Sequence, residues 1–108
     1  MESGMSNDPI FCDPRIEAVF NSDVSVSDTI RISNRMEILA EYKPYYNGGD
    51  RWFNIFFHLD SHYVGGITIA PNDERTFWGP RAMPRELWFD SFANQYSEIA
   101  EWLLWNQI

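Results

Sequence analysis

Cysteine, positive charge and long hydrophobic runs are all scarce in this sequence, and each shortage excludes a class of protein. Cys12 is the only cysteine, so no disulfide can form within the chain and a reducing, cytoplasmic setting is expected. A free cysteine is most often buried and inert, and we expect this of Cys12. No 18 consecutive residues are apolar, and residues 1–6 lack a basic region. We therefore expect no membrane-spanning helix and no signal peptide.

Basic residues are outnumbered 16 to 8 by acidic ones, which gives a net charge of −8. The excess lies at the two ends: residues 1–28 hold six acids and one base, and residues 86–108 hold four acids and no base. Such a surface repels phosphate backbones and anionic lipids, so direct binding to nucleic acid or to a membrane is not expected. A basic partner protein is the natural complement, with solubility alone as the other explanation.

Length and composition indicate one folded domain. A chain of 108 residues suits a single modest core. Hydrophobic residues make up 44% and aromatic residues 17% of the chain, which argues against disorder. We expect residues 1–9, which are polar, to be flexible, and residues 10–108 to form a single α+β domain.

Apolar residues occupy even positions from Val24 to Tyr42, a period of two that predicts strands. The strands fit residues 29–33 and 36–43, joined by a polar turn at 33–35. A helix over residues 28–42, capped by Ser27 and Asp28, is the alternative.

A second hairpin follows in the sequence. Asn47-Gly48-Gly49 supplies residues that tolerate positive φ, so a turn is expected there. The strand predicted over residues 51–59 is apolar on nearly both faces, which is typical of a central strand. In the next strand, over 63–70, Gly65-Gly66 predicts a bulge or a closely packed neighbour.

Two connecting segments complete the prediction. Asp13 before Pro14 is typical of a helix start, so we expect a short helix ending at Phe20, with an edge strand as the alternative. Residues 71–83 contain prolines, a glycine and mixed charge, and are predicted to form a loop whose Trp78 plugs the end of the core.

The last quarter of the chain, Pro84–Asn106, predicts one long amphipathic helix. Pro84 suits its first position, and Glu86 places a negative charge near its N-terminus. On a helical wheel one apolar arc forms a core face; it contains Trp88, Phe89, Phe92, Ala93, Tyr96, Ile99, Ala100 and Leu103. The fold class is therefore α+β, an antiparallel meander of about four strands packed against this helix.

The opposite side of that helix combines carboxylates with large apolar groups. Its members recur three or four residues apart and form one ridge: Leu87, Asp90, Asn94, Glu98, Glu101 and Trp105. Glu98 and Glu101 would lie toward the C-terminal half, where the helix dipole disfavours anions. We infer that something other than helix stability retains them.

One short sequence could hold a metal ion. His58, Asp60 and His62 would share one face of a continuous strand. A turn at Asp60 spoils that geometry, and no further His or Cys completes the site, so no metal or other cofactor is expected. No nucleophile elbow or phosphate-binding loop occurs either, and we expect a protein that is not an enzyme.

These observations favour a small, acidic, non-enzymatic inhibitor that blocks a basic nucleic-acid-handling protein, such as a nuclease. The ridge carboxylates would lie where phosphates bind, with Leu87 and Trp105 as apolar anchors. Small size, acidity and the lack of catalytic motifs resemble, at the level of class, phage anti-defence proteins such as anti-CRISPRs, and the immunity proteins that neutralise nuclease toxins.

Three other functions follow from other residues. A homo-oligomeric interaction module would bury Trp52, Phe56 or Trp102 between copies. An open sheet face carrying Trp52 and Phe56 could also stack nucleic-acid bases, which the net acidity opposes. A metal-dependent enzyme centred on His58, Asp60 and His62 ranks last.

Overall fold

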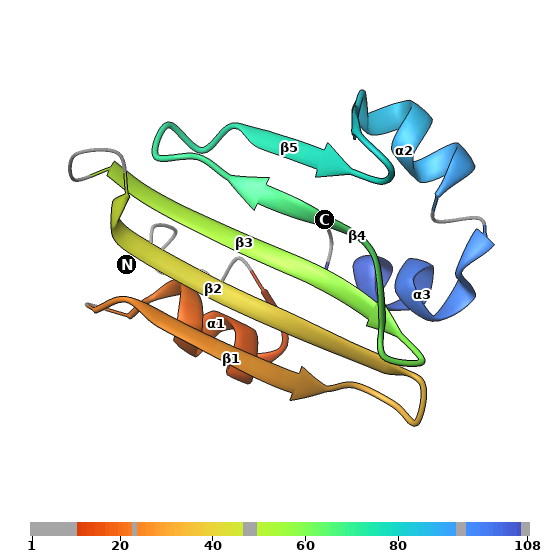
Figure 1. The fold of residues 1–108 in the computed structure, drawn as a ribbon, viewed down its shortest axis with the longest axis horizontal. Helices are drawn as coiled ribbons and strands as arrows, with labels where there is room; N and C mark the ends of the chain where they lie inside the picture. Colours follow the sequence, from red (N-terminus) through yellow and green to blue (C-terminus); the bar gives the residue numbers. More distant parts are fainter. Residues whose placement is uncertain (1–10, 23, 47–49, 93–94, 107–108) are drawn as a thin grey trace, which may run out of the picture.

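The protein is an antiparallel sheet with helices on one face (Figure 1). The computed structural model describes residues 11–22, 24–46, 50–92 and 95–106. Six strands lie side by side in chain order: β1 (Val26–Arg31), β2 (Met36–Tyr46), β3 (Asp50–Leu59), β4 (His62–Ile69), β5 (Arg75–Trp78) and β6 (Ala82–Met83). The helices are α1 (Pro14–Phe20), α2 (Arg85–Ser91) and α3 (Ser97–Trp105). The predicted α+β class with an antiparallel sheet is confirmed, with six strands instead of four.

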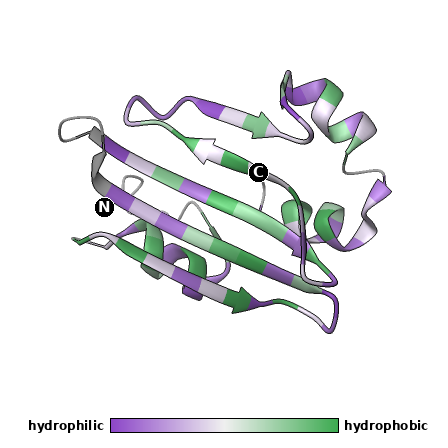
Figure 2. Ribbon diagram, viewed as in Figure 1, coloured by the Kyte–Doolittle hydropathy of each residue, from purple (hydrophilic) through white to green (hydrophobic). Residues whose placement is uncertain are grey.

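The alternation along β2 decides which face of the sheet is buried. Met36, Ile38, Ala40 and Tyr42 are buried, and their register places them beside the buried positions of β3, from Leu59 to Phe53. Figure 2 shows green, hydrophobic segments separated by purple, hydrophilic ones along β1 and β2. Two strands are present as predicted, but the first runs Val26–Arg31 in place of 29–33 and the second runs Met36–Tyr46 in place of 36–43. The alternative helix over residues 28–42 is wrong.

The hairpin from β2 to β3 also follows the prediction, since the two strands pair antiparallel. Its turn, residues 47–49, lies outside the described residues, as does the N-terminal segment predicted to be flexible. Beside Gly65 the register of β3 and β4 shifts, which is the predicted bulge. A Cβ on Gly65 would meet the Phe92 ring at 2.8 Å, so a close neighbour is present as well.

Residues 71–83 form two strands in place of the predicted loop. β5 pairs with β4, and β6 with β5. Because side chains alternate between the two faces of a strand, Phe77 lies in the core and its neighbour Trp78 lies on the opposite face. The Trp78 indole Nε1 donates a hydrogen bond to Thr68 Oγ1 there, at 3.0 Å. The expectation that Trp78 plugs the core is wrong, because Phe77 fills that place.

The predicted long C-terminal helix is two helices, α2 and α3, and Pro84 is the residue before the first of them. Trp88 packs beside Phe77 of β5, with ring centroids 5.1 Å apart. Trp102 packs beside Phe11 and Phe57. Trp88 also packs beside Phe57, so both tryptophan rings lie within 6.4 Å of the same phenyl ring. One straight helix would hold residues 88 and 102 about 21 Å apart along its axis, so core packing overrides the helical pattern of the sequence.

The N-terminal helix begins as predicted. Asp13 is its N-cap and accepts a hydrogen bond from Arg15 N at 2.9 Å, and Pro14 is the first helical residue. Burial raises the pKa of the Asp13 carboxyl, but hydrogen bonds and the positive charge of Arg15 outweigh burial and hold that pKa below its ordinary value. Ile16 and Val19 point into the core.

A buried asparagine joins the two ends of the described chain. Asn106 is 2% exposed; its Oδ1 accepts hydrogen bonds from Cys12 N at 2.8 Å and Asp13 N at 3.2 Å, and its Nδ2 donates to Trp102 O at 2.9 Å. The start of α1 is thereby fixed to the end of α3. The Cys12 side chain is exposed, so the expectation that it is buried is wrong. Only the backbone N–H of Cys12 contacts the buried Asn106. Within the described ranges no helix is long and apolar enough to cross a membrane.

Candidate functional site

The predicted ridge of the C-terminal helix is divided by the break between α2 and α3. Leu87 and Asp90 belong to α2, whereas Glu98, Glu101 and Trp105 belong to α3. The sixth member, Asn94, lies outside the described residues. The structure therefore supports no continuous six-residue ridge, although Leu87 is exposed as predicted.

The α3 half of the ridge borders a groove, which we call the α3 groove. It lies between the helix and the turn that joins β1 to β2, and has a volume of about 270 Å³. Its lining residues are Ile32, Ser33, Met36, Glu98, Glu101, Trp102 and Trp105. Sequence reasoning found its helical side but missed the turn side, because the two come together only through tertiary packing.

The two carboxylates of the groove differ in their electrostatic surroundings. Glu98 Oε2 pairs with Arg35 Nη1 at 3.0 Å, and the same guanidinium reaches Asp60 through Nε. Glu98 also lies in the first turn of α3, where the helix dipole favours an anion, so the inference that helix stability disfavours it is wrong. Glu101 is exposed and has no ion pair among the described residues.

Next to the α3 groove, the surface of α3 carries two large apolar side chains that are open to solvent. Trp105 is 52% exposed and the preceding Leu104 is 81% exposed. Leu104 was missed from the sequence because the wheel of a single long helix placed it outside the ridge. Together with Glu101, these residues give one surface that offers both a negative charge and a large apolar contact.

The three candidate metal ligands do not converge. Asp60 lies in the turn between β3 and β4, with a φ of 51°, and pairs with Arg35. His58 is opposite Tyr63, and His62 is opposite Leu59, on the other face of the hairpin. No group of three His, Cys, Asp or Glu residues in the described part of the chain could hold a metal ion.

The face of the sheet away from the helices is uncovered in Figure 1. Trp52 and Phe56 of β3 lie on it, as predicted, because their neighbours Phe53 and Phe57 are buried in the core. Trp78 joins them across the sheet, while Trp102 is only 3% exposed and cannot be a surface residue. Among the strand positions whose side chains the structure describes, this face carries Arg31 and Lys43 beside Glu37 and Glu41.

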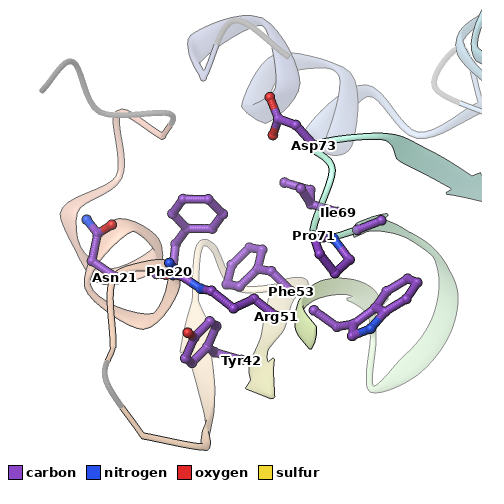
Figure 3. Close-up of a pocket in the computed structure, with 10 residues that line it drawn as sticks. Phe20, Asn21, Tyr42, Arg51, Phe53, Ile69, Pro71 and Asp73 are labelled. Carbon is purple, nitrogen blue, oxygen red and sulfur yellow. Dashed lines mark hydrogen bonds between the residues drawn. The ribbon is translucent and has the colours of Figure 1, made fainter. Parts of the chain in front are cut away.

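A pocket opens at the opposite ends of β2 and β3 from the α3 groove, and we call it the end pocket. Its volume is about 190 Å³. Figure 3 shows Arg51 extending between Phe20 and Tyr42, with Phe53, Ile69 and Pro71 beside it and Asp73 at the rim. No sequence pattern pointed to it, since its walls come from α1, three strands and a turn.

No family model, curated protein or solved structure matches this chain. Functional inference therefore depends on the chemistry of these three surfaces. The α3 groove pairs an available carboxylate with an exposed indole, which suits a cationic side chain. The uncovered face is aromatic and carries charges of both signs. The end pocket is small and combines aromatic and aliphatic side chains with the polar groups of Asn21, Arg51 and Asp73.

Proposed function

We propose that this protein is a small non-enzymatic inhibitor that binds a basic, nucleic-acid-handling protein through the α3 groove. The observation that carries the proposal is the exposure of Glu101, Leu104 and Trp105 together on one helix beside an open groove. Exposed large apolar side chains mark interaction sites when they gather with polar groups, and Trp is among the residues that dominate binding energy.

The chemistry of the α3 groove favours an arginine or lysine from the partner. A cation placed between the Glu101 carboxylate and the Trp105 ring gains both an ion pair and a cation–π contact. Arg35 illustrates the first contact, because its guanidinium already binds the neighbouring Glu98. The absence of any Lys or Arg after Arg85 leaves α3 without a basic residue of its own.

The charge of the whole chain directs this binding toward proteins that handle nucleic acid. Such proteins present basic surfaces to phosphates, and a protein of net charge −8 is attracted to them at long range. An acidic groove can then occupy part of the surface that the phosphates need. This chemistry fits two kinds of inhibitor: a phage protein that blocks a CRISPR effector, and an immunity protein that blocks a nuclease toxin.

The test uses a panel of purified CRISPR effectors and nuclease toxins and measures binding by biolayer interferometry at two salt concentrations. Glu101→Lys should weaken binding to any panel member that binds by at least about tenfold, a loss of about 1.4 kcal/mol. Glu74→Lys is the matched control, since Glu74 is an exposed carboxylate in the turn between β4 and β5. It makes the same change in net charge far from α3, and we expect it to weaken binding by less than about threefold.

Two results would contradict the proposal. Equal loss in both variants would assign binding to net charge alone and not to the α3 groove. Failure of every panel member to bind the wild-type protein would remove the proposed class of partner.

Self-association is the second candidate function, and the uncovered sheet face favours it. Two copies that each carry a net charge of −8 repel one another, but this face carries the bases Arg31 and Lys43 as well as acids. Trp52, Phe56 and Trp78 would supply the apolar contact. Sedimentation velocity across a wide concentration range decides: a monomer at every concentration removes this function, and a dimer dissociated by Phe56→Glu supports it.

A further inference from the structure

The end pocket lies against the edge of the hydrophobic core. Phe53, Ile69 and Tyr42 form its inner surface and are almost fully buried, so the pocket is a hollow next to the core. Phe20, the last residue of α1, forms an outer wall and packs edge-on against Phe53, with centroids 5.0 Å apart. An apolar group that entered here would continue the core of the protein, so its burial would be favourable.

The size of the end pocket limits what it can accept. Drug-sized ligands occupy pockets of roughly 300–1,000 Å³, which is larger than the 190 Å³ found here. A cavity of about 150 Å³ is enough for a benzene ring. The pocket therefore suits one ring or one branched alkyl group.

Arg51 supplies the polar recognition. Its guanidinium lies over the Tyr42 ring, 4.9 Å from the centroid, and its Nη2 donates to Phe20 O at 3.3 Å. These two contacts hold the side chain in place. Arg51 has no carboxylate partner among the described residues, so its other N–H groups are available to an anion, and a guanidinium binds a carboxylate with paired hydrogen bonds.

From these observations we propose that the end pocket binds a compact apolar monocarboxylate, its ring or branched alkyl group against Phe53 and its carboxylate on Arg51. Asp73 lies at the rim, and its own carboxylate points away from Arg51 (Figure 3). A second negative charge on the ligand would be repelled there, so a monoanion is preferred. This site goes beyond the proposed function, because it shares no residue with the α3 groove.

The test is an NMR titration of the full chain with three probes. 3-Phenylpropionate carries the proposed chemistry, and 3-phenylpropanamide has the same shape without the charge. We expect the acid to bind with a dissociation constant on the order of 1 mM, as suits so few atoms, and the amide at least tenfold more weakly. The carboxylate could belong to a peptide C-terminus or to a free small acid, and acetyl-Gly-Phe, which has a free carboxylate, distinguishes the two. If it binds as tightly as the acid, the pocket is assigned to a peptide C-terminus; if it binds more weakly, the pocket is assigned to a free small acid.

Two variants separate the charge from the cavity. Arg51→Met keeps an apolar stem and should weaken binding of the acid at least tenfold while changing that of the amide less than twofold. Ala70→Leu fills the pocket without changing any charge and should weaken both. If thermal unfolding shows that Arg51→Met does not fold, Arg51→Lys replaces it and should give an intermediate loss for the acid.

The proposal is overturned if the wild-type protein binds the acid and the amide equally. It is overturned too if neither probe shifts resonances of the pocket residues, or if Ala70→Leu leaves the binding of the acid unchanged. None of these results bears on the α3 groove, so this site and the proposed function fail or survive separately.

Discussion

Removing the Asn106 side chain should destabilise the fold more than its small size suggests. Asn106→Ala deletes three hydrogen bonds at once, those from Cys12 N and Asp13 N and the one to Trp102 O. Each contributes about 1 kcal/mol net, and each orphaned buried group adds a desolvation cost, so the loss is about 2–4 kcal/mol. The free energy of unfolding of a domain of this size is about 5–15 kcal/mol, so the variant should lose a large share of it.

The measurement is urea unfolding followed by tryptophan fluorescence, with thermal unfolding beside it. A loss of this size should lower the midpoint temperature by about 10 °C or more. Asn21→Ala is the matched control, because Asn21 also follows the last residue of a helix but is exposed, and its side chain donates only to Glu17. We expect the control to cost less than about 0.5 kcal/mol. If Asn106→Ala falls within about 1 kcal/mol of the control, the account of Asn106 as the link between α1 and α3 is refuted.

Three further predictions concern stability. Gly65→Ala should lower the free energy of unfolding in urea by about 1–3 kcal/mol, because the added Cβ would clash with the backbone oxygen of Trp78. Gly79→Ala should lower it less, because the nearest atom is the flexible end of the Met83 side chain. Trp88→Phe should cost about 1 kcal/mol more than Trp102→Phe, because the Trp88 indole donates a hydrogen bond at 3.0 Å and the buried Trp102 indole has no partner in the described residues; equal losses would contradict this. Asp13→Asn should destabilise the protein at neutral pH. The folded-state pKa of Asp13 lies below its ordinary value of 3.8. The wild-type protein should therefore melt at a higher temperature than the variant above pH 3.8, and this difference should disappear as the pH falls through the lower folded-state pKa. A difference in melting temperature that does not depend on pH would contradict this.

The central strands could be predicted because burial is one-sided and periodic there. From Ile30 to Tyr42 the apolar residues recur at every second position, and in a sheet only one assignment of faces buries them together. Asp13-Pro14 is a strong signal for the start of a helix. β5 and β6 were missed because each is short and flanked by Pro or Gly, so local signals favoured a loop. The sequence carries too few residues in either strand to establish a period.

The candidate site was predicted only in part, for a related reason. The helical spacing of Glu98, Glu101 and Trp105 is local and survives in α3. The break before α3 depends on where Trp88 and Trp102 find partners in the sheet, which no local pattern encodes. The α3 groove and the end pocket both need residues far apart in the chain, so neither could be predicted from periodicity or motif.

The most direct test of partner binding through the α3 groove is the response of the five tryptophan indoles to a bound partner, read from ¹⁵N-labelled protein. Trp105 borders the groove at the surface, and the buried Trp102 lines its base. Trp52 and Trp78 lie on the uncovered sheet face, and Trp88 lies in the core away from the groove. With any panel member that binds, we predict that the Trp105 indole resonance shifts or broadens most, and that those of Trp52 and Trp78 stay in place. Changes at Trp52 and Trp78 with an unaltered Trp105 would contradict the account and assign the interface to the sheet face.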